Sequence, residues 1–132
     1  MERLKERLVI AKRALDSFKE ILETPYSVMA RDAAIQRFEY TFEAVWKAAQ
    51  IYLREMEAIE SFSPKGVIRF SWKIQILSQE DSRVAMEMAN QRNLTVHTYN
   101  ESLAESIYAR LPDYLQVMRN WISNIEKQMK EV

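Results

Sequence analysis

The residues whose types could do chemistry gather in one segment, which reads Arg92-Asn93-Leu94-Thr95-Val96-His97-Thr98-Tyr99. It brings together an arginine, the single histidine of the chain and a tyrosine. Arginine presents a planar fork of donors that matches phosphate oxygens, and histidine can give or take a proton near neutral pH. These residue types together indicate phosphate chemistry.

The spacing of the segment decides whether these groups can meet. On one continuous helix, Arg92 and His97 would point about 140° apart and could not converge. They can face one pocket if a turn separates two helices there, and Tyr99 shares the side of His97 if the stretch is extended. A structural role is also open, in which Arg92 and His97 satisfy carbonyls at helix ends and Tyr99 packs with its hydroxyl in solvent.

The composition excludes several other kinds of site. One glycine in 132 residues leaves no material for a phosphate loop, a dinucleotide fingerprint or a nucleophile elbow. The absence of cysteine excludes disulfides and thiolate metal sites, and one histidine excludes a multi-histidine site within one chain. Lysine plus arginine equal aspartate plus glutamate, 19 each, which argues against a dedicated DNA coat or a strongly membrane-attracted surface. We expect no bound metal and no cofactor.

The length predicts a single domain over residues 1–132. The charged start has no apolar stretch of a signal peptide, and the longest stretch without Lys, Arg, Asp or Glu, residues 93–100, is far shorter than the ~20 residues that span a bilayer. We therefore expect a cytoplasmic protein without a membrane segment.

Apolar residues at spacings of three and four predict long helices at about 2–23, 27–60 and from 101 onward. Ser63-Pro64 predicts the start of a short third helix, and Ser78 with Asp81 predicts the start of a fourth over about 79–92. Residues 93–100 are a poor helix candidate, Asn100 can cap the last helix, and Pro112 should bend or split it. The predicted fold class is all-α, an up-and-down bundle of four to five helices.

The motif and a second block resemble one known superfamily. Arg92 and His97, separated by four residues and followed by Tyr99, resemble the R-x4-H-x-Y signature of the HEPN helical bundles. Residues 31–47, which read RDAAIQRFEYTFEAVWK, look like the second helix of one branch, the nucleotidyltransferase substrate-binding proteins. Members of that branch are encoded beside a minimal nucleotidyltransferase.

The resemblance implies a role for each motif residue. Arg92 and His97 would form a metal-independent RNA-cleaving centre, with Asn93 as polar support. Two motifs would pair across a homodimer, which fits the large content of aromatic and methionine residues. The partner nucleotidyltransferase, using ATP, would transfer AMP to Tyr99 and silence the toxin.

Two other hypotheses stand beside the ribonuclease toxin. The chain could be a non-catalytic subunit that presents a nucleotide or other substrate to the transferase in a cleft at Arg92, with Arg37, Glu39 and Glu43 as wall residues. Those three side chains also suit a solvated surface or salt bridges. The third hypothesis is a helical interaction module whose motif is structural. A nucleotidyltransferase gene alongside would favour the first two hypotheses, and growth arrest without the partner would separate them.

Overall fold

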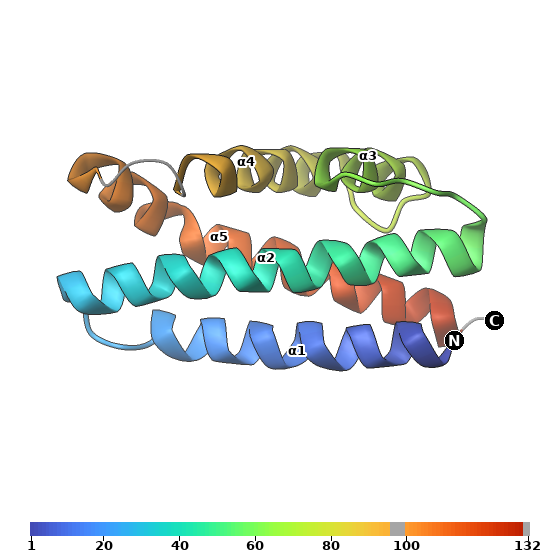
Figure 1. The fold of residues 1–132 in the computed structure, drawn as a ribbon, viewed down its shortest axis with the longest axis horizontal. Helices are drawn as coiled ribbons and strands as arrows, with labels where there is room; N and C mark the ends of the chain where they lie inside the picture. Colours follow the sequence, from blue (N-terminus) through green and yellow to red (C-terminus); the bar gives the residue numbers. More distant parts are fainter. Residues whose placement is uncertain (96–99, 131–132) are drawn as a thin grey trace.

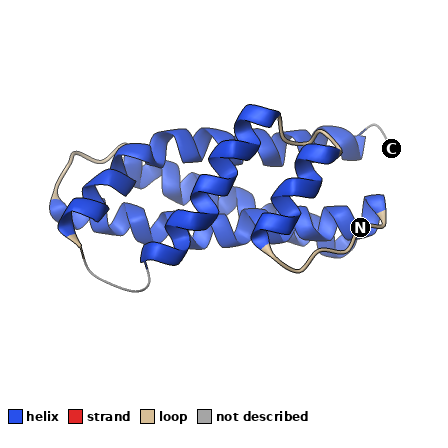
Figure 2. Cartoon of the chain, turned by 90° about the horizontal axis from the view of Figure 1, so that it is seen from above, coloured by secondary structure: helices blue, strands red, loops and turns tan. Residues whose placement is uncertain are grey.

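Five helices make up the described part of the computed structural model, and no strand occurs in it (Figure 2). The backbone is described for residues 1–95 and 100–130, and the side chains for residues 1–92 and 100–130. The helices are α1 (Glu2–Leu22), α2 (Val28–Glu57), α3 (Pro64–Lys73), α4 (Gln79–Thr95) and α5 (Glu101–Lys130). The prediction of an all-α bundle with three long helices is confirmed.

The helices form two layers joined by α5. α1 and α2 run antiparallel and side by side, α5 packs on both, and α3 and α4 lie over the other side of α2 and α5 (Figure 1). α4 packs mainly on α3 and α5. Its last turn reaches α2 through long side chains, and this is where the motif begins. In residues 1–95 and 100–130, no helix is long and apolar enough to cross a membrane.

The predicted apolar stripes build the core. Phe38 on α2 is fully buried and joins three helices, because its ring packs on Phe18 of α1, Phe42 of α2 and Tyr114 of α5 at centroid distances of 6.3, 6.2 and 5.2 Å. Truncating such a ring to alanine costs about 3–5 kcal/mol. The stripe positions buried elsewhere include Leu4, Leu8, Ala11, Leu15, Val45, Ala49, Tyr52, Ile107, Leu111, Met118, Trp121 and Ile125.

The predicted helix starts are confirmed by their caps. Ser63 Oγ accepts from Gly66 N at 3.1 Å, with Pro64 in the first turn of α3. Ser78 Oγ accepts from Asp81 N at 3.0 Å, and Asn100 Oδ1 accepts from Leu103 N at 3.0 Å. Each cap satisfies a backbone donor that a helix start leaves unpaired.

Three boundaries differ from the prediction. α5 is one helix through Pro112, so the prediction of a split is wrong: Leu111 and Tyr114 on either side are buried, and this packing offsets the backbone hydrogen bond that the proline nitrogen cannot make. α4 continues to Thr95 rather than 92, so part of the stretch predicted to be non-helical is helix. α2 stops at Glu57 because Ala58 takes a left-handed conformation with φ 55°.

Candidate functional site

Arg92 lies in the last turns of α4 and reaches across to α2. Its Nη1 lies 2.7 Å from Glu43 Oε1, and its Cζ lies 6.0 Å from the centre of the Phe42 ring. The side chain is 29% exposed, so solvent reaches part of it. An arginine in this setting can offer donors to an incoming anion while it keeps its carboxylate.

Glu43 is the common acceptor of this cluster. Trp46 Nε1 donates to its Oε2 at 3.1 Å, and Lys47 Nζ lies 3.7 Å from the same atom. Both partners follow Glu43 at helical spacings of three and four, which places them on one face of α2. The sequence interpretation had named Glu43 but not Phe42 or Trp46. The sequence signal that could have found Trp46 is its spacing of three residues from Glu43, which places both side chains on one face of a helix.

The two other expected wall residues lie elsewhere. Arg37 Nη1 donates to the Ser17 carbonyl oxygen at 2.7 Å, which ties α2 to α1 and turns the guanidinium away from Arg92. Glu39 lies one turn before Glu43, is partly buried, and makes no hydrogen bond or ion pair with the described residues. The structure thus brings only Glu43 of the three to Arg92. The Asn93 side chain, His97 and Tyr99 lie outside the described residues.

The helix that follows the motif is fixed to the start of α2. Arg31 has a fully buried side chain, and its Nη1 donates to Glu101 Oε1 at 2.6 Å and Glu105 Oε1 at 2.8 Å. Tyr26 Oη also donates to Glu105. The hydrogen bond from Tyr26, with the Arg31 guanidinium beside it, holds the pKa of Glu105 below its ordinary value. The first turn of α5 is therefore held at the point where the motif segment ends.

The helix that precedes the motif is fixed to α5. Glu87 on α4 accepts from Arg110 Nε at 2.6 Å and Nη2 at 3.0 Å, and from Tyr114 Oη at 2.5 Å. The bidentate Arg110 contact holds the pKa of Glu87 below its ordinary value, and burial with the bond to Glu87 raises the pKa of Tyr114. The two ends of the motif segment are thus anchored by separate buried or half-buried networks.

A buried acceptor lies next to Arg92. Gln91 Oε1 is shielded from solvent and has no hydrogen-bond partner among the described residues. Such an acceptor is available to an N–H or O–H donor. Among the described residues, no group of three His, Asp or Glu side chains is placed to hold a metal ion.

One family model covers this arrangement almost from end to end. Residues 6–127 match the family described as "Nucleotidyltransferase substrate binding protein like". The chain belongs to this family. The resemblance to the nucleotidyltransferase substrate-binding branch of the HEPN bundles is thereby confirmed.

Relatives of known structure share the fold of this family member. A protein from Thermus thermophilus is 52% identical and superposes with a TM-score of 0.84, covering 87% of this chain and 98% of its own. The toxin–antitoxin MntA-HpeT double mutant is 17% identical with a TM-score of 0.78, covering 96% and 99%. The tri-AMPylated Shewanella oneidensis HEPN toxin, in complex with MNT antitoxin, is 18% identical with a TM-score of 0.76, covering 94% and 96%. At such identities the last two show the fold alone.

One curated relative carries a functional name. A Haemophilus influenzae protein named "Probable ribonuclease HepT" is 28% identical over 86 residues. The match covers 62% of this chain and 58% of the relative, so the chain spans less than two thirds of that protein.

Proposed function

We propose that this chain is the HEPN subunit of a two-gene nucleotidyltransferase/HEPN toxin–antitoxin module and acts as a metal-independent ribonuclease toxin. The observation that carries the proposal is the Arg92 guanidinium, held at 2.7 Å by Glu43 and partly open to solvent, at the start of an intact R-x4-H-x-Y motif. Family membership, the name of the Haemophilus relative and the HEPN toxins of the same fold support it.

In the proposed reaction, His97 takes the proton of a ribose 2′-hydroxyl. The 2′-oxygen attacks the adjacent phosphorus, the bond from phosphorus to the 5′-oxygen breaks, and a protonated imidazole returns a proton to that leaving oxygen. Arg92 stabilises the negative charge on the phosphorane, and Asn93 gives polar support. The products are a 2′,3′-cyclic phosphate and a 5′-hydroxyl. No step uses a metal ion.

Glu43 has a defined place in this proposal. A guanidinium carries five N–H donors in a fixed plane, so Arg92 can keep its contact with Glu43 and still present donors to a phosphate. The carboxylate then orients the fork rather than blocking it. Glu43 acts through Arg92 and is a positioning residue.

A homodimer would complete the centre. One histidine per chain suffices if two copies bring their Arg92–Tyr99 segments to one cleft, and the second His97 can then supply the returning proton. The test of this part is cross-linking between the two segments. A strictly monomeric protein at micromolar concentration, or segments on opposite outer faces of a dimer, would contradict it.

Silencing would come from the partner nucleotidyltransferase. The Tyr99 phenol oxygen attacks the α-phosphorus of ATP, its proton passes to a base supplied by the partner, pyrophosphate leaves, and AMP stays on the tyrosine. The added phosphate lies within reach of Arg92 and takes the place of the RNA phosphate. Intact-mass analysis after incubation with partner and ATP should show an added mass that maps to Tyr99 and disappears in Tyr99→Phe. An added mass on Tyr108 or Tyr114 in place of Tyr99 contradicts this assignment.

A second candidate function follows from the family description itself. A non-catalytic subunit would present a nucleotide or other substrate to the transferase at Arg92, with Glu43 along the wall. Its prediction differs from that of the toxin, because no RNA cleavage and no growth arrest should follow when the chain is expressed alone.

The deciding experiment is expression without the partner, with wild type, Arg92→Ala and His97→Ala in parallel. The toxin proposal expects growth arrest and RNA ending in 2′,3′-cyclic phosphate from wild type alone, with cleavage surviving chelators. All three proteins should show equal helix content. Harmless wild type without cleavage supports the presenting subunit, and loss of activity with EDTA excludes the proposed mechanism.

A further inference from the structure

A fixed loop at the far end of α2 holds an aromatic ring in solvent. Phe62 is 83% exposed, yet the loop around it is firmly bonded: Ile59 N donates to the Leu53 carbonyl at 3.0 Å, and Gln50 Nε2 donates to the Ser61 carbonyl at 2.6 Å. The only glycine of the chain, Gly66, lies close by, and a Cβ on it would require the Ser61 hydroxyl to shift. The fold does not use this ring for packing.

The ring borders a hollow of about 230 Å³ between the start of α1 and the end of α2. Arg3 and Arg54 line it, and neither makes an ion pair with the described residues. Glu60 also lines it, so the hollow keeps a net positive charge of one. A flat ring beside two available guanidinium groups matches a nucleobase joined to phosphates.

This hollow continues the candidate site along one face of α2. Glu43, Lys47, Gln50 and Arg54 follow at spacings of four, three and four, which places them in one row. With a rise of about 1.5 Å per residue, Arg54 lies roughly 17 Å along the axis from Glu43. The row ends at Phe62, and its other end is held by Arg92.

We propose that single-stranded RNA binds along this face of α2, with one base stacked on Phe62 and its phosphates at Arg54 and Arg3. The inference rests on the proposed ribonuclease function and adds to it a binding site remote from the cleavage centre. Base stacking on an exposed ring is tolerant of sequence, and phosphate contacts carry no sequence information. The site therefore adds affinity for RNA without base preference.

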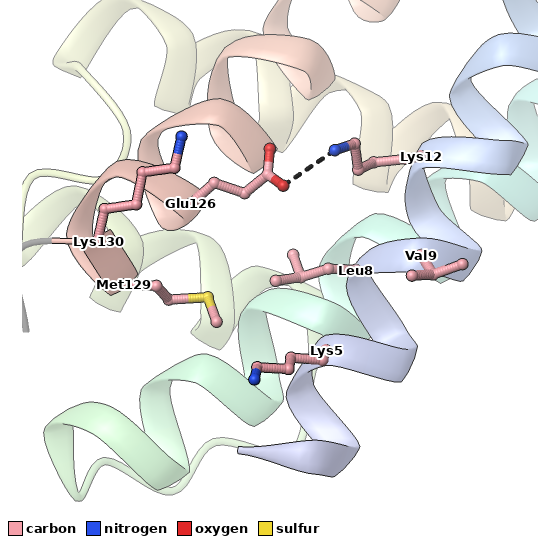
Figure 3. Close-up of a pocket in the computed structure, with 7 residues that line it drawn as sticks. All are labelled: Lys5, Leu8, Val9, Lys12, Glu126, Met129 and Lys130. Atoms are coloured by element: carbon pink, nitrogen blue, oxygen red, sulfur yellow. Dashed lines mark hydrogen bonds and ion pairs between the residues drawn. The ribbon is translucent and has the colours of Figure 1, made fainter.

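A second hollow, lined by residues of α1 and α5, supplies the matched control (Figure 3). It measures about 280 Å³ between α1 and α5, with Leu8, Val9 and Met129 as its apolar part. Lys5, Lys12 and Lys130 surround it, and Lys12 Nζ is paired with Glu126 at 3.0 Å. It offers positive charge without an aromatic ring, so it tests whether charge alone explains binding.

The test uses a fluorescein-labelled 2′-O-methyl oligouridine of about 12 nucleotides, within the usual range of single-strand sites. It lacks the nucleophilic hydroxyl, so binding is measured without cleavage. Fluorescence anisotropy gives the affinity at several salt concentrations for each variant. All substituted side chains are exposed, and unchanged melting temperatures verify that the fold is kept.

Phe62→Ala should weaken binding at least about fivefold without changing the salt slope, and Phe62→Trp should restore it. Arg54→Gln and Arg3→Gln should each reduce the slope of log K against log salt by about 0.7. Met29→Ala, which removes an 84% exposed side chain at the other end of α2, and Lys5→Gln should change neither quantity.

The proposal is overturned if wild type does not bind the strand, if Phe62→Ala matches Met29→Ala, or if Arg54→Gln matches Lys5→Gln. These outcomes are separate from the fate of the ribonuclease. Binding through Phe62 without cleavage of ordinary RNA leaves the binding site in place and removes the catalysis. If Phe62→Ala changes neither the binding nor the cleavage of RNA, the catalysis stays in place and the binding site at Phe62 is removed.

Discussion

Two arginine–glutamate pairs hold α4, and their local chemistry is almost the same. Arg110 and Glu87 are each 36% exposed and meet at 2.6 Å; Arg92 and Glu43 are 29% and 35% exposed and meet at 2.7 Å. Each glutamate also accepts from an aromatic donor, Tyr114 Oη at 2.5 Å for Glu87 and Trp46 Nε1 at 3.1 Å for Glu43. Distance and exposure alone do not tell which pair serves a reaction.

The difference lies in where each arginine stands in the chain. Arg110 is in the body of α5, with helix on both sides and a second carboxylate, Asp113, at 2.5 Å. Arg92 is near the end of α4, directly before the segment with His97 and Tyr99. A half-exposed arginine gains a functional interpretation from the reactive groups next to it, and a structural one when its neighbours are core.

The two arginines should differ most in their effect on activity. Under the proposed mechanism, Arg92→Ala should reduce RNA cleavage by about 10²–10³-fold, because it removes a donor to the charged transition state. Arg110→Ala should keep the cleavage rate of its folded fraction near that of wild type. The rate constant of 2′,3′-cyclic phosphate formation, at a temperature where both variants are folded, gives the measurement. Equal losses in the two variants would sink the assignment of Arg92.

For the stability of the fold, we expect the larger effect from the pair formed by Arg110 and Glu87. Glu87→Ala should lower the free energy of unfolding by about 2 kcal/mol, because Arg110 and the buried Tyr114 hydroxyl both lose an acceptor. Tyr114→Phe should cost about 1 kcal/mol, since Arg110 keeps its partner. Urea denaturation measures both. A Glu87→Ala protein as stable as wild type would show that this network does not hold α4.

Local features were predictable from sequence because they depend on neighbours in the chain. The stripes through Phe38 and Trp121, the cap at Asn100 and the motif itself are readable from spacings of three, four and five. The bond from Trp46 to Glu43 belongs to the same class, although only its glutamate had been named. The sequence also supplied the family resemblance that the comparisons confirm.

Long-range features were not predictable in this way. The buried Arg31 meets Glu101 and Glu105, which lie 70 and 74 residues away, and no spacing argument connects them. The extension of α4 to Thr95 and the unbroken α5 at Pro112 show packing overriding residue preference. The place of Phe62 depends on a loop held by the hydrogen bond from Gln50 to the Ser61 carbonyl, which lies 11 residues away in the chain.

The contribution of Glu87 to the stability of the fold should depend on pH. The folded pKa of Glu87 is lower than its ordinary value of 4.5, mainly because of the bond from Arg110. Its stabilising contribution is therefore complete above about pH 4.5 and is lost as pH falls through the folded pKa. Stability should fall from about pH 5 toward about pH 3, less steeply in Glu87→Gln than in wild type. Parallel curves for the two proteins would contradict the role of Glu87.

Glu43→Gln should give the smallest change in stability, and it distinguishes the role of Glu43 from that of Glu87. Trp46 and Arg92 use different oxygens of Glu43, and the amide keeps only one of them, so it can accept from one of the two donors and loses the charge. The free energy of unfolding should change by no more than about 1 kcal/mol. Without the carboxylate, Arg92 is more available to phosphate, and the salt slope for the 2′-O-methyl strand should steepen by about 0.7. The cleavage rate of bound RNA should fall several-fold, since the fork is less firmly oriented. Glu87→Gln is the matched control, with a stability change and an unchanged salt slope. If both variants leave the slope unchanged, Glu43 is a clamp like Glu87, and the two pairs are alike in function as well as in geometry.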